Sequence, residues 1–262
     1  MKAIILAAGV GKRLEAFTER RPKSLLRFGG KTLLRRHLLH LGALGIEEIT
    51  VVAGHLAGQI EAEVAGTACS APVRIVVNPL YHRGSALSLL AAANVLTDSP
   101  CLLMDADLLY ERELLRRLLR AESPNCLLVD SRLEDTGEEV KVVVRPDGRV
   151  LGLGKSVRAE GRVAGESVGI FKFDDSAGHR LVTHLRAMSE ADPDVEYEMA
   201  ICELAKDCEL VPVSADGLAW IEIDFPEDLE RARAHVYPRL EREFPDSASG
   251  DSLRRTGPRG AR

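Results

Sequence analysis

The chain has few of the features that mark several common classes of protein. Its five cysteines form no CxxC pair and show no Cys/His spacing typical of a metal site, so we assign neither zinc nor a disulfide. The opening apolar run, KAIILA, is shorter than the core of a signal peptide or a membrane span. We therefore expect a cytoplasmic protein that does not contact a membrane.

A strong excess of basic charge is also absent. The net charge is −5 and the cations are spread along the whole chain, which argues against a nucleic-acid-binding surface. Residues 12–36 are the exception, because nine lysines and arginines there face only two glutamates. Such a local basic field suits a polyanionic ligand, although a solvated helix face explains Arg35 and Arg36 equally well.

Strand-like and helix-like apolar patterns alternate along the first half of the chain. The predicted strands are 2–7, 47–53, 73–77, 100–107 and 125–130, and the predicted helices are 31–45, 56–65, 84–96 and 111–121. This order predicts an α/β fold with a doubly wound, mainly parallel mixed sheet covered on both faces. Ligands of such sheets bind at the carboxyl ends of the strands.

The pattern changes after Asp130. Residues 138–154 read as strand, turn and strand, which predicts an added β-hairpin, and another strand follows at 163–173. Helices are expected at 176–189 and 196–206, then strands LVPVS and LAWIEID that complete the sheet, and a helix opened by Pro226. We expect a single domain over 1–240 and a disordered tail over 241–262.

The most informative segment is LAAGVGKRLEAFTERRPKSLL, residues 6–26. A Rossmann fingerprint needs a third glycine where Leu14 stands, and a Walker A loop needs a glycine where Leu6 stands, so neither standard pattern fits. A glycine-rich turn after the first strand still presents backbone N–H groups to an anion. Nearby cations add positive charge: Lys12, Arg13 and Lys23.

This segment resembles the signature of nucleotidyltransferases of the sugar-phosphate type, LAAGxGxR[LM] followed by PK, and the resemblance extends over residues 1–238. It implies that residues 1–130 bind a nucleoside triphosphate and residues 131–240 an acceptor. Arg13 would meet the β and γ phosphates, and Lys23 would stabilise charge at the α-phosphorus. The implied nucleotide-binding residues are Leu6, Ala7, Ala8, Gly9, Gly11, Lys12, Lys23, Gly84 and Ser85.

Acidic residues stand at two strand ends. CLLMDADLLY ends in Asp105 and Asp107, which share a face if the strand alternates regularly, and LAWIEIDFPEDL ends in Glu222 and Asp224. Such carboxylates suit Mg²⁺, although each alone could be a solvated or capping acid. The resemblance implies Asp107 and Asp224 as the metal ligands. The expected catalytic set is therefore Lys23, Arg13, Asp107 and Asp224, and the expected cofactor is Mg²⁺.

The segment NPLYHRGSALSLL and the ending WIEIDFPEDL are similar to elements of the cytidylyltransferase branch of this family, so we expect CTP as the nucleotide. Gly84 and Ser85 open a helix, where backbone and hydroxyl groups can contact a base. An ordinary capped helix after a turn explains these two residues as well.

The acceptor is expected to be a small phosphate or phosphonate. Aromatic residues make up only 4% of the chain, and Val140 and Lys141 stand where phosphocholine relatives carry a cage tryptophan. Acidic groups suit a primary ammonium, as in 2-aminoethylphosphonate, whereas inositol phosphate or a sugar phosphate remains an alternative. The predicted acceptor-binding residues are Lys141, Lys155, Glu196, Tyr197, Glu198, Trp220 and Glu222.

Taken as an enzyme of this kind, the protein would be a cytidylyltransferase in which the acceptor oxygen attacks in line and expels pyrophosphate. One alternative is a sugar-1-phosphate nucleotidylyltransferase using UTP, dTTP or GTP. Another is a noncatalytic nucleotide-binding regulatory protein, which would commonly lack a metal aspartate or the PK lysine. Many relatives form dimers, but the sequence identifies no interface for a homo-oligomer.

Overall fold

The structure is a computed structural model that describes residues 1–133, 136–157 and 159–243. Among them, nine strands form one mixed sheet, whose parallel half has the order β6-β1-β4-β5. These strands are β1 (Lys2–Ala7), β4 (Glu48–Ala53), β5 (Val73–Val77) and β6 (Cys101–Asp105). Three of the four are almost wholly buried, as the near-continuous apolar runs predict for strands covered on both faces.

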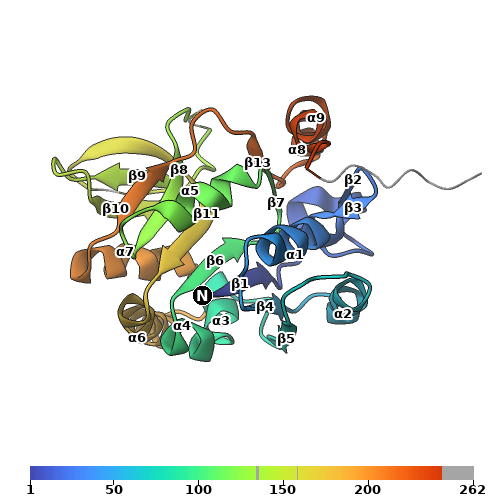
Figure 1. The fold of residues 1–262 in the computed structure, drawn as a ribbon. Helices are drawn as coiled ribbons and strands as arrows, with labels where there is room; N and C mark the ends of the chain where they lie inside the picture. The colour runs from blue at the N-terminus through green and yellow to red at the C-terminus, as the bar shows by residue number, and fades with distance from the viewer. Residues whose placement is uncertain (134–135, 158, 244–262) are drawn as a thin grey trace, which may run out of the picture.

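The other half of the sheet is mainly antiparallel and is organised by one long strand, β11 (Arg162–Phe173), which pairs with three neighbours. Its pairing register shifts near Gly165 and Gly169, whose φ angles of 152° and 75° favour glycine. The hairpin of β9 and β10 lies at the end of the sheet opposite β5 (Figure 1). The remaining strands of this half are β8 (Cys126–Asp130), β9 (Lys141–Val144), β10 (Val150–Gly154) and β12 (Val211–Ser214).

Helices cover both faces of the sheet, so the doubly wound α/β prediction is confirmed. One core packs α3, α4, α6 and α7 against side chains such as Ile4 and Leu103. The opposite core packs α1, α2 and α5 against Ile5 and Met104. The bounds of these helices are α1 (Leu33–Ala43), α2 (Ala57–Ala65), α3 (Ser85–Leu90), α4 (Ala93–Asp98), α5 (Glu113–Arg120), α6 (Asp175–Ala191) and α7 (Tyr197–Asp207).

Two sequence predictions about regular elements were wrong. The helix expected over 84–96 is broken at Ala92, whose φ of −106° and ψ of 20° leave the helical region. No glycine or proline marks this break, so helix propensity could not reveal it. LAWIEID does not complete the main sheet, because β13 (Trp220–Glu222) pairs with β7 (Leu108–Tyr110) in a separate two-stranded sheet.

A third, smaller core lies beneath that two-stranded sheet and the C-terminal helices α8 (Pro226–Arg231) and α9 (Tyr237–Leu240). A short hairpin of β2 (Arg27–Phe28) and β3 (Lys31–Thr32) adds Phe28 to it. Of the expected tail, residues 241–243 form a turn, and residues 244–262 lie outside the described part of the chain. None of the helices among the described residues has the length and hydropathy needed to span a bilayer.

Candidate active site

The glycine-rich loop that follows β1 forms one wall of a cavity of about 420 Å³. Gly11 has a φ of 67°, and its carbonyl accepts a 2.7 Å hydrogen bond from the Thr18 hydroxyl, which closes the loop onto the following 3-10 helix, Lys12–Phe17. A Cβ at Gly9 would meet nothing within 4 Å, so its backbone faces open space. The predicted residues that line this cavity are Leu6, Ala7, Ala8, Gly9, Gly11, Lys12, Arg13, Lys23, Ser85, Asp107, Glu196 and Asp224.

Lys23 lies at the centre of the site. Its Nζ donates to Asp107 Oδ2 at 2.7 Å and to Asp224 Oδ1 at 2.5 Å, so a single ammonium joins residues 84 and 201 positions away in sequence. Burial alone would lower the pKa of Lys23, but the charges of Asp107 and Asp224 outweigh it and raise that pKa above its usual value. The lysine is therefore a fixed positive charge at any physiological pH.

Asp107, Glu222 and Asp224 form a cluster in which one carboxylate oxygen of each lies within 4.8 Å of the others. Asp107 comes from the turn after β6, Glu222 ends β13, and Asp224 precedes α8, where its backbone N–H donates to the Asp228 carboxylate at 2.9 Å. Asp107 Oδ1 is buried and has no hydrogen-bond partner. The cluster thus offers hard oxygen ligands of the kind that Mg²⁺ prefers.

The two aspartates of CLLMDADLLY do not share a strand face as expected. The strand β6 ends at Asp105, and Asp107 lies in the turn that follows, so strand alternation no longer applies to it. Asp105 Oδ2 instead accepts a 2.7 Å hydrogen bond from the Tyr197 hydroxyl. Burial, and secondarily the charge of Asp107, raises the pKa of Asp105 well above its usual value.

A second cavity, of about 510 Å³, adjoins the first, and Asp105, Glu196 and Asp224 line both. Acidic side chains dominate it, and Lys155 is the one cation among its described lining residues. Glu198 Oε2 is buried without a hydrogen-bond partner, and burial raises the pKa of Glu198 to about 7. The predicted acceptor residues that line this cavity are Lys155, Glu196, Tyr197, Glu198 and Glu222.

Helix α7 and helix α3 begin beside each other and connect the two cavities. The Ser85 backbone N–H donates to Glu196 Oε2 at 3.2 Å, and the Tyr197 backbone N–H donates to the Ser85 hydroxyl at 2.9 Å. A predicted base-binding residue and two predicted acceptor-binding residues are therefore joined directly. No sequence pattern predicts this link, because 111 positions separate Ser85 from Glu196.

Three predicted site residues lie outside these two cavities. Trp220 donates from Nε1 to Asp130 Oδ2 at 2.7 Å and lines a different cavity of about 420 Å³. Lys141, the first residue of β9, lines none of the three cavities. Gly84 also lines none of them, and a Cβ there would collide with the Val195 carbonyl oxygen, so packing explains this glycine.

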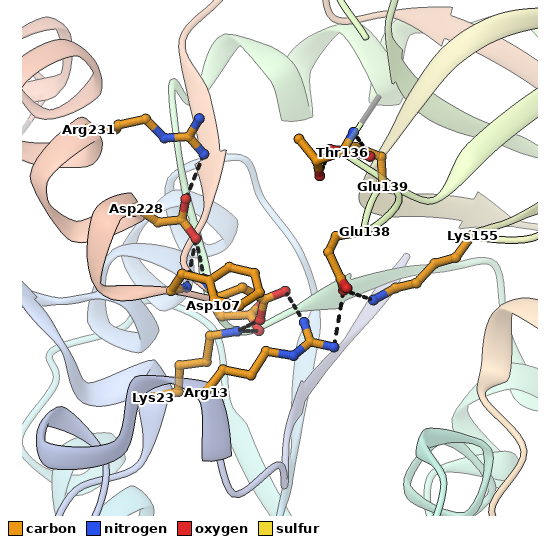
Figure 2. A network of polar contacts seen from close by, with 11 residues as sticks. Arg13, Lys23, Asp107, Thr136, Glu138, Glu139, Lys155, Asp228 and Arg231 are labelled. Atoms are coloured by element: carbon orange, nitrogen blue, oxygen red, sulfur yellow. Dashed lines mark hydrogen bonds and ion pairs between the residues drawn. The ribbon is translucent and has the colours of Figure 1, made fainter. Parts of the chain in front are cut away.

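Sequence analysis missed Glu138, which lines the acidic cavity and contacts Arg13 of the first cavity. Its carboxylate bonds Lys155 at 2.9 Å and approaches Arg13 Nη2 at 3.3 Å, while Arg13 Nη1 donates to Asp224 Oδ2 at 3.1 Å (Figure 2). In sequence, Glu138 is one acid in the polar run DTGEEV, which looks like any solvated loop. Only the tertiary contacts of its carboxylate with Arg13 and Lys155 distinguish Glu138 from a solvated acid.

The fold and the site together define a class of nucleotide-binding transferase: a mainly parallel sheet, a glycine-rich loop after its first strand, and a lysine between acidic residues. Residues 3–189 match the model of a family described as the MobA-like NTP transferase domain. The chain belongs to this family, which confirms the nucleotidyltransferase resemblance.

Known proteins show the same relationship. The chain is 38% identical over 240 residues to a bifunctional IPC transferase and DIPP synthase of Rubrobacter xylanophilus, covering 89% of this chain and 51% of that protein. It is 24% identical over 258 residues to a CTP:phosphoglutamine cytidylyltransferase of Campylobacter jejuni, covering 88% and 98%. The chain spans about half the length of the bifunctional relatives it matches.

Among solved structures, the inositol-1-phosphate CTP transferase of T. maritima superimposes with a TM-score of 0.77 at 21% identity. The match covers 94% of this chain and 96% of that chain. At this identity the match establishes a shared fold, and it agrees with the predicted mainly parallel sheet.

Proposed function

We propose that this protein is a Mg²⁺-dependent cytidylyltransferase that transfers CMP from CTP to a small phosphorylated alcohol or phosphonate and releases pyrophosphate. The observation that carries the proposal is the position of Lys23 between Asp107 and Asp224, beside the junction of the two cavities. A nucleotide in the first cavity and an acceptor in the second would meet at this junction. Binding two reactants in line is the main source of rate in such a transfer.

The residues present fit a divalent cation. Asp107, Glu222 and Asp224 would hold it, and the buried Asp107 Oδ1 without a partner is a free ligand atom for it. When bound, Mg²⁺ would neutralise charge on phosphate oxygens and orient them. Glu222 joins this set in addition to its predicted acceptor role.

The chain's own side chains account for the remaining chemistry. Arg13 would hold the β and γ phosphates with its planar fork of N–H donors, and Lys23 would neutralise the charge that develops at the α-phosphoryl group. Lys155 would bind the acceptor's anionic group. An acceptor oxygen then forms a bond to the α-phosphorus as the bond to the β-phosphate oxygen breaks, and pyrophosphate carries away that electron pair. No covalent intermediate with the enzyme is needed.

The choice of substrates within this proposal rests on the lining of the two cavities and on the relatives. CTP is favoured by the NPLYHRGS segment, of which Tyr81, His82, Arg83 and Ser85 line the first cavity, and by the names of the C. jejuni and T. maritima proteins. The unpartnered Oε2 of Glu198 suits an ammonium or a hydroxyl of the acceptor. Both 2-aminoethylphosphonate and inositol 1-phosphate satisfy this requirement.

The test is a pyrophosphate-release assay with Mg²⁺ that pairs CTP, UTP, dTTP, GTP and ATP with phosphocholine, 2-aminoethylphosphonate, inositol 1-phosphate and glucose 1-phosphate. We expect turnover with CTP and an alcohol phosphate or a phosphonate. The Asp107→Asn variant serves as the control that the activity belongs to this protein. Turnover only with glucose 1-phosphate and another nucleotide would instead support a sugar-1-phosphate nucleotidylyltransferase, and no turnover with any pair would contradict the proposal.

A further inference from the structure

We infer that Asp228 is a positioning residue of the carboxylate cluster: it fixes the backbone that carries Asp224 and thereby sets the affinity of the cluster for a divalent cation. Asp228 itself would not bind the cation, since both of its carboxylate oxygens already accept hydrogen bonds from this chain. The inference rests on the proposed function, because it assumes that Asp107, Glu222 and Asp224 hold Mg²⁺.

Asp224 lies in the three-residue connection between β13 and α8, and each backbone N–H group of this connection has a partner. The Ile223 N–H donates to the Asp107 carbonyl oxygen at 3.2 Å. The N–H groups of Asp224 and Phe225 both donate to Asp228 Oδ2, at 2.9 and 2.7 Å. One carboxylate oxygen therefore fixes two of the three backbone donors in the segment that presents a proposed metal ligand.

The Asp228 side chain is itself held in place. It is the third residue of α8 and is buried, and its Oδ1 accepts a 2.6 Å hydrogen bond from Arg231 Nη2 (Figure 2). Hydrogen bonds to a carboxylate are stronger than those between neutral groups. Backbone N–H groups that lose such an acceptor are costly to leave unpaired, so without Asp228 we expect the connection to shift toward other partners.

A shift of this connection would move several contacts of the site at once. Asp224 Oδ1 accepts from Lys23 Nζ at 2.5 Å, and Asp224 Oδ2 accepts from Arg13 Nη1 at 3.1 Å. The Arg13 guanidinium also lies over the Phe225 ring, 5.3 Å from its centroid. The hydrogen-bond partners of metal ligands commonly set metal affinity through the ligands they orient. Asp228 would act in this way, through the backbone of Asp224.

The experiment measures the binding of Mn²⁺ without nucleotide, from the loss of the electron paramagnetic resonance signal of the free ion. Mn²⁺ takes the same oxygen ligands as Mg²⁺. For Asp228→Ala we expect the Kd for Mn²⁺ to rise about tenfold, the lower end of the range for loss of a ligand's hydrogen-bond partner. For Asp228→Asn, which keeps one acceptor oxygen but loses the charge, we expect a rise of about threefold. If Asp228→Ala does not fold, the Asn variant carries the test.

Two further variants act as controls. Asp107→Asn should abolish the measured binding, which would identify the carboxylate cluster as the Mn²⁺ site. Asp174→Ala is the matched control for loss of a helix-capping acid, because Asp174 caps α6 by accepting from the Ala177 N–H at 2.7 Å and lines none of the three cavities. It should lower the thermal unfolding midpoint, as Asp228→Ala should, and leave the Kd for Mn²⁺ within about twofold of the wild type.

All titrations are made well below the unfolding midpoint of every variant, so that lost stability alone cannot change the Kd. A purely structural role of Asp228 would lower the midpoint and leave the Kd unchanged, and that result would overturn the inference. Equal weakening by Asp174→Ala would overturn it too, as would no Mn²⁺ binding by the wild type or binding that Asp107→Asn leaves intact.

The Mn²⁺ titrations and the pyrophosphate-release assay separate this inference from the proposed function. If the wild type turns over but Asp228 has no effect on the Kd, the proposed function survives and the inference fails. If the Kd depends on Asp228 but no substrate pair turns over, the inference survives and the proposed function fails.

Discussion

The two cavities of the site contrast in how they are built and in their charge. The nucleotide side has one continuous segment, residues 6–13, in its wall, and it is lined by four lysines and arginines: Lys12, Arg13, Lys23 and Arg83. The acceptor side draws acids from four elements that are far apart in sequence, and Lys155 is the one cation among its described lining residues. Under the proposed function, this difference teaches that a triphosphate would be recognised by a local sequence motif, whereas a small acceptor would be recognised by a pocket that exists only after folding.

The largest expected effect comes from a substitution in the carboxylate cluster beside the junction of the two cavities. Asp107→Asn removes one negative charge from the carboxylate cluster and one ionic partner from Lys23. The kcat for pyrophosphate release should therefore fall about 10³-fold, equivalent to several kcal/mol of transition-state stabilisation. Because Asp107 is partly exposed, the thermal unfolding midpoint should change little. Retention of a tenth or more of the wild-type kcat would remove Asp107 from the catalytic set.

A substitution in the acidic cavity should have a smaller effect and should alter the KM for only one of the two substrates. Lys155→Met is expected to raise the KM for the acceptor about tenfold, the value of one charge-assisted hydrogen bond, and to leave the KM for CTP within about twofold of the wild type. Steady-state kinetics with each substrate varied in turn measures this. An equal rise in both KM values would show that Lys155 does not belong to the acceptor side alone.

Trp220→Phe is the control for Lys155→Met. Trp220 was predicted at the acceptor site, yet it bonds Asp130 and lines a different cavity. We therefore expect the KM for the acceptor to change less than about twofold, and stability to fall by about 1 kcal/mol with the loss of one hydrogen bond. A large rise in the acceptor KM would restore the original interpretation of Trp220.

The smallest effect on the reaction, and a distinct one on stability, is expected from the buried histidine beneath the nucleotide side. His37 bonds the Ala106 carbonyl at 3.2 Å and the Tyr110 hydroxyl at 3.1 Å, and burial lowers the pKa of His37 to about 3. The folded state keeps it neutral while the unfolded chain protonates it below about pH 6.5. Stability should therefore be full above pH 6.5 and fall by roughly 1.4 kcal/mol for each pH unit below it, down to about pH 3.

Urea unfolding measured at several pH values checks this. In His37→Gln the slope of unfolding free energy against pH should be shallower by up to one proton between pH 6.5 and pH 4, because this histidine no longer contributes. His40 is also buried with a lowered pKa, so part of the slope should remain in the variant. An unchanged slope would mean that His37 does not control acid stability.

The success of sequence analysis varied with how local each feature is. The strand KAIILA, the glycine-rich loop and the hairpin at Pro146–Gly148 depend on neighbouring residues, and the structure has them where the patterns predict. The break at Ala92 and the separate pairing of β13 depend on distant packing, and propensity could not reveal them. In the same way, Lys155 and Glu198 were predicted as acceptor residues and line the acidic cavity, whereas Glu138 lines the same cavity and was not predicted.

By itself, the sequence determined the family, the doubly wound α/β fold and the loop that faces the nucleotide side. It could do so because apolar periodicity and a glycine-rich turn act through neighbouring residues. Only the tertiary structure decided that Lys23 lies between Asp107 and Asp224, that Trp220 belongs to another cavity, and that Glu138 lies between Arg13 and Lys155. These contacts join residues that are up to 201 positions apart in the sequence, and they depend on packing that no local pattern encodes.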